Sequence, residues 1–370
     1  MPFWKAGKND DQVLEELKET QKQNADEFVK EQAHSQKAKK PSLTVDNDFT
    51  PVEYDPQYIL QVNHLKKYFP IKGGMVSKTV GYVKAVDGVT FNLKRGTTMG
   101  LVGESGCGKT TTGRTILRLY DEKTSGQVLF NGQEVYDLSP KEMRAMRTKM
   151  QIIFQDPFSS LSPRMPVGEI IGEAVREHNL VPKEEFDDYI DKVMDNCGLQ
   201  PFHKGRYPHE FSGGQRQRIG IARAIVLEPD LIIADEPISA LDVSIQAQVI
   251  NLLNDLRNKM GLTIMFIAHN LSVVKYFSDR IGVMYYGKLV ELADSDELFE
   301  HPLHPYTKSL LSAIPYPDPH HEKHRQRIEY KPLKEHDYSV NKPSLREIKP
   351  GHFINCNDEE FERYKKELGL

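Results

Sequence analysis

The stretch Gly103-Glu104-Ser105-Gly106-Cys107-Gly108-Lys109-Thr110 holds the residues whose types and spacing are best suited to chemistry. It fits G-x-x-x-x-G-K-[ST], a glycine-rich loop whose backbone N–H groups bind the phosphates of a nucleotide. Lys109 is suited to reach the β- and γ-phosphates, and the Thr110 hydroxyl to ligate Mg²⁺. Thr111, the next residue, is predicted to contact the nucleotide as well.

Four more polar residues stand at the ends of apolar runs that are typical of buried strands. They are Gln155 after residues 150–154, Asp235 and Glu236 after residues 231–234, and His269 after residues 263–268. Asp235 is suited to hold Mg²⁺, and Glu236 beside it to act as the general base for an attacking water. Gln155 is suited to ligate Mg²⁺ or to position water, and the His269 imidazole to hydrogen-bond a γ-phosphate. Glu236 as a solvated carboxylate and His269 as an ordinary capping residue are the alternatives.

A third site is predicted at Phe211-Ser212-Gly213-Gly214-Gln215. Ser212 and Gln215 have the spacing of a capping box, so a helix should begin here. The N-terminus of that helix and the Ser212 hydroxyl both suit a γ-phosphate. Residues 239–242 follow later as a turn, and Asp242 is predicted to contact the nucleotide.

Elements that could position these residues alternate along the chain. Strands are predicted over residues 59–65, 83–93, 97–102, 127–130, 150–154, 231–234, 263–268, 281–286 and 288–292, and helices over 111–120, 140–148, 167–199, 213–227, 243–260 and 301–314. Strands alternating with helices favour a parallel sheet whose ligand lies at the carboxyl ends of the strands. We therefore predict an α/β fold that gathers the polar residues at one edge.

Together these motifs resemble the ATP-binding cassette (ABC) transporter ATPases over roughly residues 58–295. The Ser-Gly-Gly-Gln sequence at 212–215 separates this class from other phosphate-loop proteins. The resemblance implies a mainly parallel core sheet, an antiparallel β subdomain and an inserted helical subdomain. It also implies a head-to-tail dimer, in which Ser212 and Gly214 contact ATP held on the partner's loop.

Two positions refine this comparison. Tyr68 stands where the family places an aromatic residue that stacks on adenine; a place in the core beside Phe69 is the alternative. Phe211 departs from the family, which usually has Leu there, but both side chains are apolar.

Three further stretches resemble the ATPases of oligopeptide and dipeptide permeases, in particular the second, F-type, ATPase of such systems. They are residues 154–164, residues 235–248 and His304-Pro305-Tyr306-Thr307. This resemblance implies ATP and Mg²⁺ as cofactors and a paralogous D-type ATPase subunit as the other half of the dimer. It further implies two membrane-spanning permease subunits and, indirectly, an extracellular peptide-binding protein. The expected location is peripheral, on the cytoplasmic face of the cell membrane, with Gln155 and residues 167–199 as the docking surface.

Composition limits the other possibilities. The net charge of −4 gives no reason to expect nucleic-acid binding. Cys107, Cys197 and Cys356 lie far apart, which indicates a reducing compartment and no zinc site. Only Cys356 lies in the C-terminal region where many peptide permeases carry an iron–sulfur cysteine cluster, so no cluster is expected. Neither a secretory signal nor an apolar run of the ~20 residues that a membrane span needs is seen.

Domain boundaries are predicted at composition changes. We expect an N-terminal extension over residues 1–57, an ABC ATPase domain over 58–300 with its helical subdomain at about 160–225, and a C-terminal extension over 301–370. The first is either a mobile tail or a docked helix. Residues after 314 are either an irregular small lobe or a loose tail, in which His320, His321 and His324 are metal ligands or solvated side chains.

Two other functions remain open at this point. A soluble ATP-driven clamp on nucleic acid or ribosomes usually has two cassettes in one chain or a long coiled coil, and this chain has neither. An exporter often carries its membrane segments in the same chain. Cys107 is more suited to filling space than to acting as a nucleophile, although a helix N-terminus could lower its pKa.

Overall fold

The structure is a computed structural model, and it describes residues 49–73, 78–314, 327–336, 338 and 340–370. These residues fall into two compact units. The described residues of one unit are 69–73 and 78–83, the outer parts of the long strands β1 (Tyr58–Gly73) and β2 (Lys78–Lys94). The other unit contains all remaining described residues, including every predicted site residue that the structure describes.

A mainly parallel sheet forms the centre of the larger unit. Among the described residues it has eight strands, in the order β11-β12-β10-β9-β3-β8-β7-β6. The parallel strands are β9 (Arg280–Tyr285), β3 (Thr98–Val102), β8 (Thr263–Ile267), β7 (Leu231–Asp235) and β6 (Met150–Ile153). The antiparallel strands are β10 (Lys288–Asp294), β12 (His352–Cys356) and β11 (Ser344–Lys349). The predicted core sheet is therefore confirmed.

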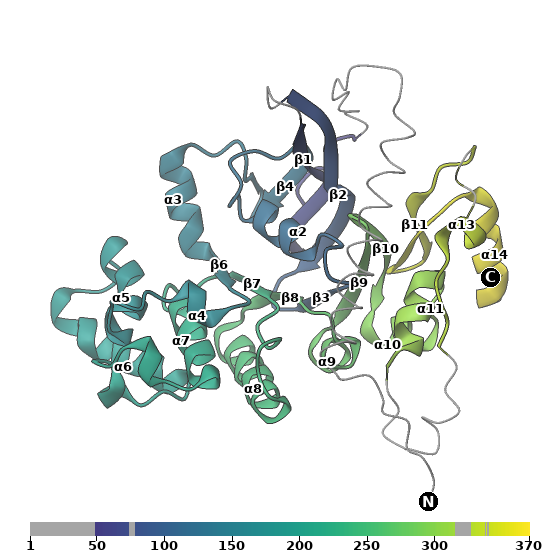
Figure 1. The fold of residues 1–370 in the computed structure, drawn as a ribbon. Coiled ribbons are helices and arrows are strands. Elements are labelled where there is room, and N and C mark those ends of the chain that lie inside the picture. Colours follow the sequence, from purple (N-terminus) through teal and green to yellow (C-terminus); the bar gives the residue numbers. More distant parts are fainter. Residues whose placement is uncertain (1–48, 74–77, 315–326, 337, 339) are drawn as a thin grey trace, which may run out of the picture. The chain divides into compact units, whose positions relative to one another are not determined.

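Alternate residues of β7 point to opposite faces of this sheet. Ile232 and Ala234 join a core with helices α8 (Val243–Met260) and α9 (Leu271–Phe277). Leu231 and Ile233 join a second core that includes Ile116 of helix α2 (Lys109–Ile116). Figure 1 shows α8 and α9 on one side of the sheet and α2 on the other. Because both faces are covered, the central strands are continuous apolar runs, which made them predictable.

An antiparallel sheet lies on the α2 side. Its strands have the order β2-β1-β4-β5, with β4 at Ser125–Phe130 and β5 at Gln133–Glu134. Residues 49–57, which the sequence placed in the N-terminal extension, are bonded to this sheet. The Val52 N–H donates to the Gln127 side chain (2.9 Å), and the Asn63 amide donates to the Thr50 carbonyl (2.9 Å). The first 48 residues, the greater part of the predicted extension, lie outside the described residues.

The helical subdomain is inserted between β6 and β7, and helix α3 lies directly before β6 in the chain. Its elements are α4 (Pro157–Ser160), α5 (Val167–Glu177), α6 (Phe186–Asn196), α7 (Gly213–Ile225) and the 3₁₀ turns η1 (Lys183–Glu185), η2 (Pro201–His203) and η3 (Pro208–Glu210). Helix α3 spans Pro140–Lys149 and begins at a Ser139 capping box. Ile171 of α5 and Met194 of α6 are fully buried in one core with α7, as their helical spacing predicted.

The C-terminal region is more regular than predicted. Helix α10 spans Ser295–Glu300, α11 Pro305–Ser312, α13 Pro332–Glu335 and α14 Asp358–Leu368. The helix predicted over 301–314 begins only at Pro305, because proline suits the first helical position and His304 caps it. Instead of an irregular lobe or a loose tail, residues 344–356 form the hairpin β11–β12, which pairs with β10 and extends the central sheet.

Candidate functional site

The phosphate loop, residues 103–110, joins β3 to α2 as the motif requires. Gly103 and Gly108 have positive φ angles of 150° and 109°. A Cβ atom at Gly103 would lie 2.2 Å from the Met284 carbonyl oxygen, and one at Gly108 would lie 2.1 Å from that of Ala85. Both positions therefore exclude any side chain. The first N–H groups of α2 have no partner inside the helix, which is the arrangement that binds an anion.

Lys109 is buried beneath this loop. Its Nζ donates to the carbonyl oxygens of Gly103 (2.7 Å) and Glu104 (2.9 Å). The same Nζ lies 4.0 Å from a carboxylate oxygen of Glu236. One ammonium group therefore connects the loop to the candidate base, at the place where a terminal phosphate would need a positive charge.

Thr110 and Asp235 are directly bonded. The Thr110 hydroxyl donates to Asp235 Oδ1 (2.7 Å), and Arg114 Nη2 lies 3.8 Å from Oδ2. Burial raises the pKa of Asp235, opposed by the Thr110 hydrogen bond and the Arg114 charge. Within the described residues, the buried Oδ2 has no hydrogen-bond partner. A hydroxyl beside a carboxylate oxygen with a free lone pair is a donor set that fits Mg²⁺.

Glu236 is the centre of the polar cluster. It accepts a hydrogen bond from Gln155 Nε2 (2.9 Å), and His269 Nδ1 lies 3.6 Å from the same Oε2. Its backbone is in the left-handed region, with φ 46°, and its N–H donates to the Ile267 carbonyl (3.0 Å). A strained non-glycine backbone at a polar strand end is typical of functional sites. The structure thus brings Gln155, Glu236 and His269 together from the ends of three different parallel strands.

The signature turn, residues 212–215, is built locally. Ser212 caps α7: the Gln215 N–H donates to its hydroxyl (3.3 Å), and the Ser212 N–H donates back to the Gln215 side chain (3.0 Å). The predicted capping box is therefore confirmed. Ser212, Gly213 and Gln215 are exposed. No hydrogen bond or ion pair among the described residues joins this turn to the phosphate loop of the same chain. Asp242 is likewise exposed and lies directly before α8, as its N-cap residue.

Tyr68 is half-buried on strand β1 of the antiparallel sheet. Its hydroxyl donates to the Asp87 carboxylate, and Lys84 Nζ lies 5.4 Å from the centre of its ring. The Tyr68 N–H donates to the Thr124 hydroxyl (2.8 Å). A partly exposed ring whose hydroxyl is held in this way is compatible with stacking on a base.

Cys107 and the C-terminal histidines give simpler results. Cys107 is buried, and burial raises the pKa of its thiol by more than the Lys109 charge and the backbone N–H groups at the start of α2 lower it. His320, His321 and His324 lie outside the described residues. Within the residues that the structure describes, no group of three or more His, Cys, Asp or Glu side chains could hold a metal ion.

Sequence reasoning missed two residues of the site. Arg114 lies one helical turn after Thr110, so the i, i+4 spacing on α2 could have placed it beside Asp235. Tyr306 of α11 accepts a hydrogen bond from the Glu104 N–H (3.0 Å) across 202 positions of sequence. No local pattern could have indicated that second contact.

Comparisons with known proteins agree with this geometry. The family model described as "ABC transporter" matches residues 86–239, and the one described as "Oligopeptide/dipeptide transporter, C-terminal region" matches residues 290–341. The oligopeptide transport ATP-binding protein OppF of Bacillus subtilis (strain 168) is 56% identical over 308 residues, which are 83% of this chain and 98% of that protein. The chain belongs to the ATP-binding proteins of the oligopeptide/dipeptide ABC transporters. The dipeptide transport ATP-binding protein DppF of Lactococcus lactis subsp. cremoris (strain MG1363) is 50% identical over 318 residues, 85% of this chain and 99% of that protein.

Solved ABC structures share the fold of this ABC ATPase. The dimeric ATP-binding cassette MJ0796, in a post-hydrolysis state bound to ADP and Pi, has a TM-score of 0.57 and 26% identity, covering 64% of this chain and 98% of that one. CbiO1 from Clostridium perfringens, part of the ABC transporter complex cbiONQ, has a TM-score of 0.56 and 28% identity, covering 66% and 91%. The predicted fold class and the predicted ATP-hydrolysing activity are confirmed. In the described part of this ABC ATPase, no helix has the length and apolar character of a membrane span.

Proposed function

We propose that this ABC ATPase hydrolyses ATP to drive the import of oligopeptides or dipeptides. It does so as one half of a head-to-tail dimer with a paralogous D-type subunit, bound to two membrane-spanning permease subunits at the cytoplasmic face of the cell membrane. An extracellular peptide-binding protein delivers the peptide. The names of the relatives, oligopeptide and dipeptide transport ATP-binding proteins, support the choice of substrate.

One observation carries the dimer: the chain presents two incomplete halves of a nucleotide site. Thr110 is bonded to Asp235 and Lys109 lies against Glu236, while the signature turn is largely exposed. Among the described residues, no hydrogen bond or ion pair joins this turn to the phosphate loop. A helix N-terminus attracts phosphate, yet here it does not reach the loop of its own chain. A second cassette facing the first would supply the missing half to each site.

The residues have distinct roles in the proposed hydrolysis. The phosphate loop, with Lys109, holds the β- and γ-phosphates of ATP, and Tyr68 stacks on adenine. Glu236 takes a proton from the attacking water, and the hydrogen bond from Gln155 and the nearby His269 orient its carboxylate. Thr110 and Asp235 would hold Mg²⁺, which when bound neutralises phosphate charge.

The signature turn, residues 212–215, of the partner then contacts the γ-phosphate through its Ser hydroxyl and helix N-terminus. Closure of the dimer therefore depends on ATP, and release of phosphate opens it. Gln155 belongs both to the Glu236 cluster and to the loop before the helical subdomain, so it links hydrolysis to the proposed permease docking surface.

A clamp on nucleic acid or ribosomes receives no support from any observation of this chain. The net charge is −4, and a nucleic-acid surface needs concentrated positive charge. No observation of this chain favours an exporter either. The relatives reported above are named for oligopeptide and dipeptide transport, and the C-terminal family model is that of the oligopeptide/dipeptide transporters.

The test is isolation of the tagged full chain from its native membranes in mild detergent, with identification of the bound chains. We expect permease subunits and a second ABC ATPase, and an ATPase rate that rises when peptide-loaded binding protein is added. Lys109→Ala should retain the bound chains but lose the activity. Recovery of ribosomes or nucleic acid in place of membrane subunits would contradict the proposal.

A further inference from the structure

A buried tyrosine of the C-terminal region contacts the phosphate loop. Tyr306, near the start of α11, is 2% exposed, and its hydroxyl oxygen accepts the hydrogen bond from the Glu104 N–H (3.0 Å). Glu104 is the second residue of the loop, and its carbonyl accepts from Lys109 Nζ (2.9 Å). The N–H of Glu104 is therefore bonded to Tyr306, and its carbonyl group is bonded to Lys109.

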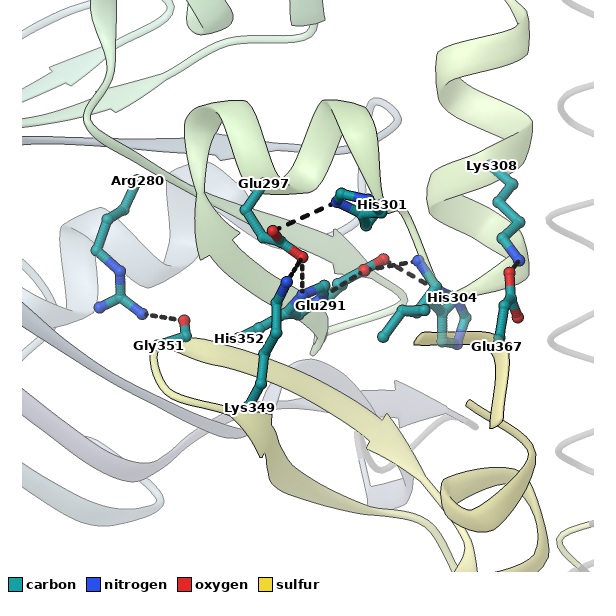
Figure 2. Close-up of polar contacts among 11 residues, drawn as sticks. Arg280, Glu291, Glu297, His301, His304, Lys308, Lys349, Gly351, His352 and Glu367 are labelled. Atoms are coloured by element: carbon teal, nitrogen blue, oxygen red, sulfur yellow. Dashed lines mark hydrogen bonds and ion pairs between the residues drawn. The ribbon is translucent and has the colours of Figure 1, made fainter. Parts of the chain in front are cut away.

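The start of α11 is itself fixed by a buried carboxylate. Glu291 of β10 is fully buried and accepts hydrogen bonds from the N–H groups of Leu303 (2.8 Å) and His304 (3.1 Å). The same carboxylate lies 2.9 Å from His352 Nε2. Figure 2 shows Glu291 between His352 and the backbone of His304. One carboxylate therefore ties the C-terminal hairpin to the beginning of α11.

The far side of the His352 ring is also held. His352 Nδ1 lies 3.0 Å from a carboxylate oxygen of Glu297, which Lys349 Nζ approaches to 2.6 Å. His301 lies on the other oxygen of Glu297 (3.4 Å). A buried ring with a carboxylate at each nitrogen is fixed in orientation. The position of Glu291, and through it of α11, is therefore well determined.

His304 and the neighbouring rings determine where the Tyr306 side chain lies. His304 Nδ1 accepts a hydrogen bond from the Tyr306 N–H (3.1 Å), and burial lowers the pKa of His304 to about 3, so this nitrogen remains an acceptor at neutral pH. The rings of Tyr285 and Tyr330 pack on that of Tyr306, with centroids 4.4 and 5.5 Å away. Burial also raises the pKa of Tyr306, so the phenol at the loop stays neutral.

We infer that Tyr306 is a positioning residue of the nucleotide site, through which the C-terminal region holds the phosphate loop in its binding conformation. The inference rests on the proposed role of residues 103–110. A loop that is already ordered loses less conformational freedom when it binds a phosphate. The Glu104 N–H is used to fix the loop, while the N–H groups at the start of α2 remain directed to the anion.

Phenylalanine at this position tests the hydroxyl while keeping the ring. In the full chain, Tyr306→Phe should weaken ADP binding roughly 3- to 10-fold, the equilibrium value of one hydrogen bond. KM for ATP should rise by the same factor while kcat changes little, because the interaction is made in both ground and transition states. Calorimetric titration with ADP and steady-state ATPase assays measure these constants.

Tyr364→Phe is the matched control. Tyr364 is also 2% exposed and lies in the C-terminal region, but its hydroxyl accepts from Arg363 (3.3 Å) instead of the loop. ADP affinity should be unchanged in this variant. If both variants weaken ADP binding equally, the effect is loss of C-terminal packing and the inference is overturned; it is overturned as well if neither variant does so.

Two further measurements separate the possible failures. Lys109→Ala must lose ADP affinity if residues 103–110 bind phosphate; if it binds ADP normally, the proposed site itself fails. Should Tyr306→Phe not fold, residue-resolved amide exchange of the wild-type chain replaces it. Strong protection of the Glu104 amide beside a fast-exchanging Ser105 amide would support the inference, and equally fast exchange at both would overturn it.

Discussion

The phosphate-loop region and the signature turn are built in opposite ways, although both are predicted to bind the same phosphate. In the first, the four side chains of Lys109, Thr110, Gln155 and His269 contact Glu236 or Asp235. In the second, Ser212 and Gln215 satisfy one another at an exposed helix start. The loop region is thus ordered by the whole sheet, and the turn by one capping box.

This difference separates two kinds of function within one chain. Groups that must be aligned to within a fraction of an ångström for hydrolysis lie at the ends of buried parallel strands, which are rigid. The turn that, in the proposed dimer, meets the phosphate bound by the other chain lies on an inserted subdomain, where it can be exposed. Three predictions can break or sharpen this contrast.

The largest effect is expected at Glu236. Glu236→Gln should lower turnover roughly 10²- to 10⁴-fold, the contribution of a general base, while nucleotide affinity is kept. Glu134→Gln is a matched control, because its side chain has nearly the same exposure, 15% against 14%, and also pairs with a lysine. ATPase assays and ADP titrations of both variants measure this. Turnover at the wild-type level in Glu236→Gln would remove Glu236 from the role of base.

An intermediate effect is expected at Ser212. Ser212→Asp keeps a capping oxygen but adds a negative charge where the partner's γ-phosphate would lie, so ATPase activity should fall by roughly tenfold or more. ADP binding by the isolated chain should not change. Ser139→Asp makes the same replacement at the exposed capping box of α3 and should leave activity unaltered. Equal rates for the two variants would mean that the turn does not meet a phosphate.

The smallest effect is a gain of stability at Asp235. Burial raises the pKa of Asp235, so the folded chain keeps this proton to a higher pH than the unfolded chain. The contribution of Asp235 to the free energy of unfolding therefore falls as the pH rises through the folded-state pKa of this carboxyl. It stays low at neutral pH, where the carboxyl is ionised in both states. Without nucleotide, Asp235→Asn should raise Tm on the order of 2 °C at about pH 7 and less at about pH 4.

Asp156→Asn provides the opposite case. The hydrogen bond from the Phe158 N–H lowers the pKa of Asp156, which is exposed at the start of α4. Its ionised form is already favoured in the folded chain, so the substitution should give no rise in Tm. Thermal unfolding of both variants measures the two changes in Tm. A higher Tm for Asp156→Asn than for Asp235→Asn would contradict the explanation by burial of the Asp235 charge.

Local sequence patterns were sufficient to predict helix ends that are set by residues next to them in the chain. Helix α8 has the predicted ends, Val243 and Met260, and the structure shows that Gly261, with a left-handed backbone, stops it. The Ser212 capping box was also visible from spacing alone. The helix after the phosphate loop was predicted to reach residue 120 but ends at Ile116, since Arg118 takes a positive φ of 49° that no periodicity indicates.

Contacts between distant segments could not be predicted in this way. The hairpin at 344–356 has short, half-exposed strands, and its pairing with β10 joins segments about 60 positions apart. The contact of Tyr306 with Glu104 depends on β9 lying next to β3, which follows from sheet order and not from sequence. The motifs indicated what the site contains, and the topology determined what else touches it.

The order of the central sheet also has a consequence for biosynthesis. Strand β3, which carries the phosphate loop, pairs on one side with β8 and on the other with β9. Both partners leave the ribosome more than 160 positions after β3 itself. Pairings over such separations form late, and until then the apolar β3 is exposed. Nascent chains of this ABC ATPase should therefore depend on chaperones until strand β9 has emerged, and ATP cannot help them fold before that point.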